Sequence, residues 1–391
     1  MRIASLFKQP KVSLLAGIPS LNMNLFHKCQ FAVGDPAVWL EWPQLDGHVE
    51  SLFLLRDIEM ERARVESQAS HVACPATFEP IGGLSGDRET ATAQALAHCL
   101  KAHHVLAVRT DRSLPFVYAN ILQESGVRLE YDPNMGVMDR RFKTEIELKY
   151  LAQAQTVTET VMLKACQTIC RAEADPDGKL YHEGSLLTSE RLRCMIDDWL
   201  LKEGFANPGS IVACGKQGAD CHAAGTGPLW TGQPVIVDIF PVNKQTRYHG
   251  DCTRTAVHGT VPAEVQRAYQ AVVKAKQAAI GVTREGISGQ AVHEATLAAL
   301  RENGFEYGLD RQQQHPDRWF MVHGTGHGIG LEVHEPPLLD MKGPALGAHE
   351  VLTIEPGLYS LQTGGVRSED MVVVQAQGAR NLNGLPDTLS W

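Results

Sequence analysis

The chain is organised around one stretch, residues 323–337, which reads HGTGHGIGLEVHEPP. It holds three histidines and four glycines and follows the apolar run 319–322. Imidazole is the commonest metal ligand among side chains and titrates near neutral pH, and glycine lets the backbone approach a ligand closely. His323 and His327 are four residues apart, but the surrounding glycines disfavour a helix. We therefore expect a strand and loop that carry isolated imidazoles. A glycine-rich turn with incidental histidines would look the same, so residues elsewhere must decide.

Length and composition describe a globular chain of two domains. A chain of 391 residues exceeds what one hydrophobic core usually fills. Hydrophobic residues make up 43% and charged residues 21%, as in ordinary globular proteins. The formal charge of −9 argues against a phosphate-binding surface, which needs clustered Lys and Arg. No apolar run reaches the roughly 20 residues that span a bilayer. We expect neither nucleic acid nor membrane as a partner.

Cysteine usage bears on the compartment. Nine cysteines are scattered along the chain with no CxxC pair. Disulfide frameworks belong mainly to small secreted domains, so this usage predicts reduced thiols and a cytoplasmic location. Basic residues at positions 2, 8 and 11 precede the apolar run 12–18, as in a signal peptide. The run is short and Pro19 interrupts it, so we read it as mature protein.

Residues 1–140 alternate short apolar runs with helical stretches, which predicts an α/β layer architecture. We expect strands at 51–55, 104–108 and 127–131, and helices at 89–102 and 114–124. Four histidines of this part have no carboxylate partners at a recognisable spacing: His71, His98, His103 and His104. We therefore expect residues 1–140 to form a companion domain without a catalytic constellation.

Turn-forming residues at 132–136 and the pair Arg140-Arg141 mark the change to a second domain, 141–391. A long helical pattern covers 144–174, where Asp-Pro-Asp-Gly at 175–178 ends it. Further patterns predict helices at 189–203, 263–280 and 288–303, and strands at 211–214, 235–240, 351–354 and 371–374. The acidic and imidazole residues of interest lie at the ends of these strands and not on the helices.

Five residues of the second domain can be read as metal ligands: Asp238, Asp251, His327, Glu355 and Glu369. Asp238 lies within the apolar run VIVDI. A buried carboxylate is costly there unless a cation or dense hydrogen bonding offsets it. Four carboxylates and one imidazole are about what two divalent ions need while leaving room for water.

Each of these residues also has an ordinary explanation. Asp238 could cap a turn at the end of its strand, and Glu355 could be a plain turn residue. Two others could form local ion pairs, Asp251 with Arg254 and Glu369 with Arg367. The occurrence of all five in this order is what favours a metal centre.

Asp238 is followed by four motifs that contain the other four residues: GDxTRT, GHGIGxxxHE, IEPG and GGVRxED, which begin at positions 250, 326, 354 and 364. In this order the motifs resemble those of the pita-bread metallopeptidases, which include methionine aminopeptidase, Xaa-Pro aminopeptidase and prolidase. The resemblance covers residues 142–391 and implies an α/β fold with a curved sheet and pseudo-two-fold symmetry. A smaller N-terminal α/β domain of the creatinase type marks the proline-directed members. Residues 1–140 would fill that place.

The resemblance implies a centre of two divalent metal ions, which could be Mn, Co, Fe or Zn. Asp251 and Glu369 would bridge both ions. Asp238 would chelate one ion, and His327 and Glu355 would hold the other. A hydroxide between the ions would attack the scissile carbonyl, and Glu355 would carry its proton towards the leaving amine.

Four further residues match positions around the family's substrate. His334 would donate to the substrate carbonyl or the oxyanion, and His222 would face the substrate backbone. His323 matches a histidine of the proline-directed members, and Arg367 an arginine that orients carboxylates. Two segments are longer than in the family, the hairpin 242–249 and residues 175–187, and neither removes a ligand.

The resemblance therefore implies a metal-dependent exopeptidase that acts on peptide substrates with proline after the first residue, and that forms a homodimer. One alternative is a non-catalytic peptide-binding module, since some relatives keep the fold and have lost the ligands. Another is a methionine aminopeptidase-like enzyme, which needs no large N-terminal domain. Retention of the five ligands with His222 and His334 favours the enzyme. Dipeptides and longer peptides both remain open as substrates.

Overall fold

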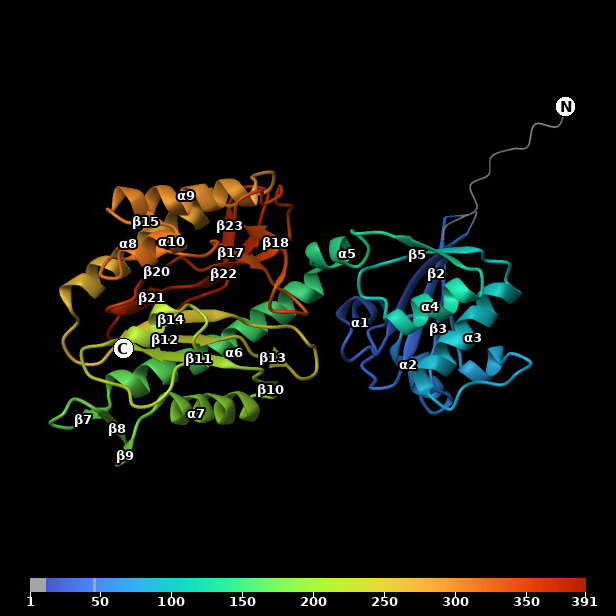
Figure 1. Ribbon diagram of the computed structural model, residues 1–391, viewed down its shortest axis with the longest axis horizontal. Coiled ribbons are helices and arrows are strands. Elements are labelled where there is room, and N and C mark those ends of the chain that lie inside the picture. The colour runs from blue at the N-terminus through green and yellow to red at the C-terminus, as the bar shows by residue number, and fades with distance from the viewer. Residues whose placement is uncertain (1–11, 45–46) are drawn as a thin grey trace. The chain divides into compact units, whose positions relative to one another are not determined.

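The computed structural model describes residues 12–44 and 47–391 (Figure 1). Contacts within the chain divide it into two compact units, Met1–Arg140 and Arg141–Trp391. Strands and helices alternate in the first unit, as the sequence predicted, whereas in the second unit runs of several strands lie between and after the helices. Of the helices in the described part of the chain, none combines the length and apolar character that a membrane crossing requires.

The first unit is built on a six-stranded mixed sheet in the order β4-β3-β2-β1-β5-β6. Its strands are β1 Val12–Gly17, β2 Ala37–Pro43, β3 Val49–Leu54, β4 His71–Ala73, β5 Ala107–Thr110 and β6 Arg128–Tyr131. Its helices are α1 Met23–Cys29, α2 Met60–Glu66, α3 Arg88–Ala102, α4 Phe116–Glu124 and α5 Val137–Arg141, with short 3-10 turns η1 Asp57–Glu59 and η2 Pro75–Phe78.

Alternation along the central strand gives this sheet two buried faces. Leu14 packs in a cluster with side chains of α3 and α4, whereas Leu15 packs in a second cluster with α1 and α2. The apolar run that resembled a signal peptide is therefore the core strand β1, and the basic residues before it lie outside the described residues. The strand expected at 104–108 begins only at Ala107, because His104 adopts a left-handed backbone with φ 56°.

The second unit begins with the long helix α6 Glu145–Cys170. Thr144 caps it, and the side chain of Glu147 reaches back to the cap, which forms a capping box. The helix ends four residues earlier than expected. Residues after it form a small antiparallel sheet of β7 Glu173–Ala174, β8 Leu180–His182 and β9 Ser185–Leu186. The long segment 175–187 is largely this sheet.

Three larger sheets follow, and two pairs of helices cover them (Figure 1). The first sheet contains β11 Ser210–Cys214, β12 Pro234–Ile239 and β14 Cys252–Val257; the four-stranded sheet contains β15 Glu306–Tyr307, β16 Phe320–Met321, β20 Gly357–Ser360 and β21 Gly364–Arg367. The five-stranded sheet contains β17 Gly326–Gly328, β18 Glu335–Leu339, β19 Val351–Ile354, β22 Asp370–Val374 and β23 Ala379–Asn381. A two-stranded pair consists of β10 Phe205–Ala206 and β13 Val242–Asn243, and the remaining helices are α7 Ser189–Lys202, α8 Ala263–Val282, α9 Gly289–Glu302, α10 Leu309–Gln314 and η3 Gly215–Ala219.

Each helix pair buries an apolar stripe against its sheets. Side chains of α6 and α7 pack with β11, β12 and β14 in one core cluster. Side chains of α8 and α9 pack against the sheets formed by residues 306–381. The helices thus cover the outer faces, and the polar candidate residues lie at strand ends, as expected.

Candidate metal centre

All the candidate residues line one pocket of about 700 Å³ in the second unit. The acidic members and the imidazole proposed as ligands are Asp238, Asp251, His327, Glu355 and Glu369. The surrounding members are His222, His323, His334 and Arg367. Residues as distant in the sequence as His222 and Glu369 therefore meet at one place.

Strand register brings the carboxylates together. Asp238 is the penultimate residue of β12 and pairs with Thr253 of the antiparallel β14, just after Asp251. Glu355 follows β19 and Glu369 precedes β22, and the register Ile354 to Asp370 places these two at the same end of their antiparallel pair. Because paired strand ends meet at one edge, four carboxylates separated in sequence share one pocket.

The centre of the pocket is a cluster of Asp251, His327 and Glu369. All three are buried, and their ligand atoms lie within 4.8 Å of one another. His327 Nε2 is 3.5 Å from Glu355 Oε1 and 3.9 Å from Asp251 Oδ2. His327 Nδ1 lies 3.0 Å from the carbonyl oxygen of Gly328, to which it donates as the neutral tautomer. This leaves Nε2 free to bind a metal ion.

Strand β17, which carries the candidate ligand His327, requires glycine beside this histidine. A Cβ atom on Gly326 would lie 2.0 Å from the carbonyl oxygen of Thr353, on the neighbouring strand. A side chain would therefore force the two strands apart and move the imidazole. This close approach explains part of the glycine pattern that first marked the stretch.

Asp238 has one satisfied and one unsatisfied oxygen. Its Oδ2 accepts a hydrogen bond from Arg367 Nη2 at 2.7 Å. Its Oδ1 is buried, and no polar atom of the described residues is its partner. A buried carboxylate oxygen without a partner is costly, and a cation would satisfy it. The residues present therefore fit a bound metal ion.

Electrostatics support the same conclusion. Burial, with repulsion from the neighbouring carboxylates, raises the pKa of Asp251 and of Glu369 well above their ordinary values. Burial also raises the pKa of Glu355 to about 7, and it lowers the pKa of His327 to about 4. These three carboxyl groups resist ionisation because they are buried close together, and the imidazole beside them is neutral. Divalent cations would supply positive charge among them.

The two arginines considered as ion-pair partners of Asp251 and Glu369 pair with other carboxylates in the structure. Arg254 pairs with Asp370 at 2.8 Å, and Arg367 pairs with Asp238. Glu369 Oε2 instead accepts a hydrogen bond from Thr253 Oγ1 at 2.8 Å. Both arginines thus hold neighbouring groups in place, and the two buried carboxylates face the pocket.

The remaining histidines differ in how they are held. The ring of His334 lies 4.5 Å from the ring of His327, nearly perpendicular to it. His222 is exposed on the loop after η3. His323 is tied at both nitrogens: Nε2 lies 2.7 Å from Tyr359 Oη and Nδ1 lies 2.7 Å from the Gly324 carbonyl oxygen. Both ring nitrogens of His323 are therefore already engaged, and neither is available to a ligand in the pocket.

Tyr359 links His323 to Arg367 and was missed by the sequence reasoning. Its hydroxyl accepts from Arg367 Nη1 at 3.0 Å. Arg367 Nη1 also donates to the carbonyl oxygen of Cys221 at 3.1 Å. Burial and the charge of Arg367 lower the pKa of His323 to about 3, so this imidazole stays neutral. No sequence pattern marked Tyr359, which looks like any aromatic residue of a buried strand.

Two more supporting residues had weak signals in the sequence. Thr253 lies inside the quoted motif GDxTRT, and its hydroxyl contacts both Glu369 and Arg367. Gln155 is fully buried on α6, where its side chain accepts from the backbone nitrogen of Asp251 and donates to the backbone oxygen of the same residue. A glutamine on the apolar face of a helix was the available clue.

Comparison with known proteins assigns the family. Residues 149–376 match the family model for metallopeptidase family M24. The chain belongs to metallopeptidase family M24. This finding confirms the resemblance inferred from the motifs.

Relatives of this M24 chain are named for peptides that contain proline. It is 30% identical over 269 residues to Xaa-Pro aminopeptidase 1 of Streptomyces coelicolor, across 63% of this chain and 52% of that protein. It is 26% identical over 247 residues to the Xaa-Pro dipeptidase of Pyrococcus furiosus, across 62% and 63%. The chain thus spans less than two thirds of the length of these relatives.

The fold extends the likeness to both units. The crystal structure of the X-Pro aminopeptidase from Thermotoga maritima superposes with a TM-score of 0.76 and 21% identity, and the match covers 97% of each chain. At 21% identity, this match shows similarity of fold only. The predicted α/β fold of a pita-bread domain with a smaller N-terminal α/β domain is confirmed.

Proposed function

We propose that this M24 peptidase is a metal-dependent exopeptidase that cleaves the bond after the first residue of peptides with proline in the second position. The observation that carries the proposal is the buried group of four carboxylates and one imidazole, in which Asp238 Oδ1 has no partner among the described residues. A non-catalytic binding module would have no need for such a costly arrangement.

In this proposal the ions are held by the five residues that the motifs indicated. The ligand atoms of Asp251, Glu369 and His327 lie within 4.8 Å of one another, which supports a bridging role for the two carboxylates. Asp238 would also hold one of the ions, and His327 together with Glu355 would hold the other. Two divalent ions, when bound, would polarise the scissile carbonyl and make a water molecule acidic enough to act as nucleophile. Manganese, cobalt, iron and zinc all suit these donors.

The chain's own residues would bind the substrate and move the proton. Glu355, whose pKa is about 7 before any ion binds, lies beside the cluster and would carry the proton from the water to the leaving amine. His334, packed on the ring of His327, would donate to the oxygen of the scissile carbonyl as it becomes negative. Arg367 would hold Asp238 in its orientation.

The preference for proline is supported by the walls of the pocket and by the relatives' names. Large apolar side chains line the pocket beside the carboxylates, among them Ile211, Phe240, Val333 and Leu338. An apolar wall suits the ring of proline, which carries no amide hydrogen to satisfy. Relatives named for Xaa-Pro dipeptides and for Xaa-Pro aminopeptidase activity are both similar to this chain.

The proposal includes a homodimer and a cytoplasmic location. Large apolar side chains are exposed on the first unit, Ile81, Leu106 and Phe116 among them, which supports a partner subunit there. All nine cysteines are free thiols, which supports a reducing compartment. Light scattering of the purified protein would test the dimer.

A substrate panel tests the proposed function. Metal-reconstituted protein is incubated with Xaa-Pro dipeptides, Xaa-Pro tripeptides and Met-Ala peptides, and released residues are quantified. We expect cleavage of Xaa-Pro bonds and none of Met-Ala, and the two lengths of peptide decide between dipeptidase and aminopeptidase. Cleavage confined to Met-Ala would favour the methionine aminopeptidase-like alternative. Peptide binding without turnover under any divalent ion would favour the binding module.

A further inference from the structure

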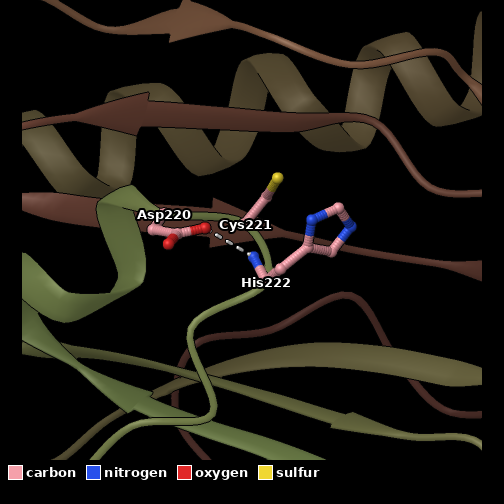
Figure 2. Close-up of side chains that lie close together, drawn as sticks. All are labelled: Asp220, Cys221 and His222. Carbon is pink, nitrogen blue, oxygen red and sulfur yellow. Dashed lines mark hydrogen bonds between the residues drawn. The ribbon is translucent and has the colours of Figure 1, made fainter.

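Three consecutive residues at the edge of the pocket lie close together: Asp220, Cys221 and His222 (Figure 2). Their ligand atoms, a carboxylate oxygen, a thiol sulfur and an imidazole nitrogen, lie within 4.8 Å of one another. They follow the turn η3, and Asp220 Oδ1 accepts a hydrogen bond from the backbone nitrogen of His222 at 2.9 Å. This group is separate in composition from the buried cluster, which contains no sulfur.

The donor set is the one that zinc prefers. Thiolate, imidazole and carboxylate are the protein ligands of Zn²⁺, at about 2.3 Å for sulfur and about 2.0–2.1 Å for nitrogen. In a tetrahedral site, sulfur and nitrogen donors on one ion therefore lie about 3.6 Å apart. Asp220 and His222 are exposed, so a small rotation of either side chain closes the remaining gap. Sulfur selects Zn²⁺ or Cd²⁺ over the hard ions Mg²⁺ and Mn²⁺.

The donors are available and their backbone is anchored. Within the described chain, no hydrogen bond or ion pair engages the imidazole of His222. Cys221 is a free, half-buried thiol. The carbonyl oxygen of Cys221 accepts from Arg367 Nη1, and Arg367 also holds Asp238. A fixed backbone therefore presents movable side chains beside the candidate metal centre.

We propose that Asp220, Cys221 and His222 form a separate site for one thiophilic divalent cation such as Zn²⁺, and that its occupation inhibits hydrolysis. On binding, the thiol of Cys221 releases its proton to solvent and its sulfur bonds the ion. The ion also takes the imidazole of His222, which then no longer faces the substrate. The inhibitory half of the proposal rests on the proposed function, and the binding half rests on the three side chains alone.

Cadmium is the probe that tests binding. A cadmium–thiolate bond absorbs in the ultraviolet, and the carboxylate–imidazole cluster supplies no sulfur. Cd²⁺ is titrated into manganese-loaded protein, and we expect a saturable charge-transfer band. Cys221→Ser should abolish this band, and Asp220→Asn should weaken cadmium binding at least about tenfold. Cys194→Ser is the matched control, because Cys194 is an exposed thiol on α7, and it should keep the band.

The binding half is overturned if wild-type protein gives no band or if Cys221→Ser keeps it. Inhibition is then measured with Zn²⁺ on an Xaa-Pro peptide, relative to each variant's own rate without zinc. We expect zinc to inhibit the wild type and to inhibit Cys221→Ser much less. Cadmium binding at Cys221 with equal zinc inhibition of both proteins would overturn the inhibitory half. Absence of hydrolysis in every protein would refute the proposed function while the cadmium titration still decides the site.

Discussion

Arg367 donates from Nη2 to Oδ2 of Asp238 over 2.7 Å, while Oδ1 of the same carboxylate is buried without a partner among the described residues. The guanidinium thus fixes the carboxylate plane and occupies one oxygen only. The other oxygen is left for a group that the chain itself does not provide. In the proposed centre, Arg367 would position Asp238 for a cation.

The first prediction concerns this arginine. Arg367→Lys keeps the charge but loses the planar fork that reaches Asp238, Tyr359 and the Cys221 carbonyl together. We expect affinity for Mn²⁺ to fall about 10- to 100-fold, as for other residues that orient metal ligands. Calorimetric titration of metal-free protein measures it. Arg318→Lys, an exposed change in the same unit, is the control, and equal affinity in the two variants would refute the role.

The carboxylates proposed as bridges, Asp251 and Glu369, give the second prediction. Asp251→Asn or Glu369→Gln replaces a charged bridge with an amide that offers one good oxygen and no charge. We expect at most one ion per chain by elemental analysis, loss of hydrolysis and a retained fold by circular dichroism. Glu264→Gln, at an exposed position of α8, should keep the wild-type metal content. Full metal content in either cluster variant would remove it from the ligand set.

The third prediction separates substrate binding from metal binding. The ring of His334 packs edge-on against that of His327 and is not assigned to an ion, so His334→Ala should leave both ions in place. The loss of one donor to the oxyanion typically lowers kcat by about 10²–10³, and KM should change much less. The exposed His315→Ala is the control. Unchanged kcat in His334→Ala would mean that another residue supplies this donor.

Much of this candidate centre could be predicted because most of its residues lie in short sequence motifs. Asp238, Glu355 and Glu369 each lie in or near an apolar run rich in β-branched residues, so their positions at strand ends followed from local pattern. Asp251 precedes β14, whose sequence CTRTAV mixes polar and apolar residues, and no strand was predicted there. The long helices followed from periodicity and from caps such as Thr144 and Ser288, which the structure shows bonded to the first turns.

Other parts were outside the reach of local pattern. Strands β17, β20 and β21 are three or four residues long and rich in glycine, so no alternation marks them. The contacts of Tyr359 and Lys143 with distant residues depend on how sheets pack, which periodicity does not reveal. The end of α6 at Cys170 was missed because β7 pairs with β8 only after the chain turns back.

The fourth prediction concerns a buried ion pair behind His334. Lys143 Nζ lies 3.1 Å from Glu335 Oε2, and both side chains are buried. Lys143→Met would leave a buried charge without this partner, which typically costs about 3–5 kcal/mol of unfolding free energy. The double variant Lys143→Met/Glu335→Gln should lose less, because the uncompensated charge is gone. Urea denaturation measures both, and a double variant less stable than the single one would contradict this account.

The fifth prediction is a pH dependence of the metal-free protein. The pKa of Glu355 is raised to about 7, and those of Asp251 and Glu369 are also raised, so the folded state holds protons that the unfolded chain releases. Stability then falls as pH rises. The lowered pKa of His327 makes stability rise with pH, but this contribution is complete above pH 6.5, the ordinary pKa of histidine.

Thermal denaturation therefore separates the two effects. From pH 6.5 upward, the midpoint of the metal-free protein should decrease with pH, and Glu355→Gln should flatten the decrease. Manganese should flatten it as well, because bound cations favour the ionised carboxylates. A midpoint that rises with pH over this range would contradict the assigned carboxyl groups.

The most direct test of the central claim is turnover against metal content. Metal-free protein receives increasing equivalents of Mn²⁺, and hydrolysis of an Xaa-Pro peptide is measured at each step. The account predicts no hydrolysis without metal and a rate that saturates at two equivalents per chain. Hydrolysis by the metal-free protein, or none at any manganese content together with none under cobalt, iron or zinc, would contradict it.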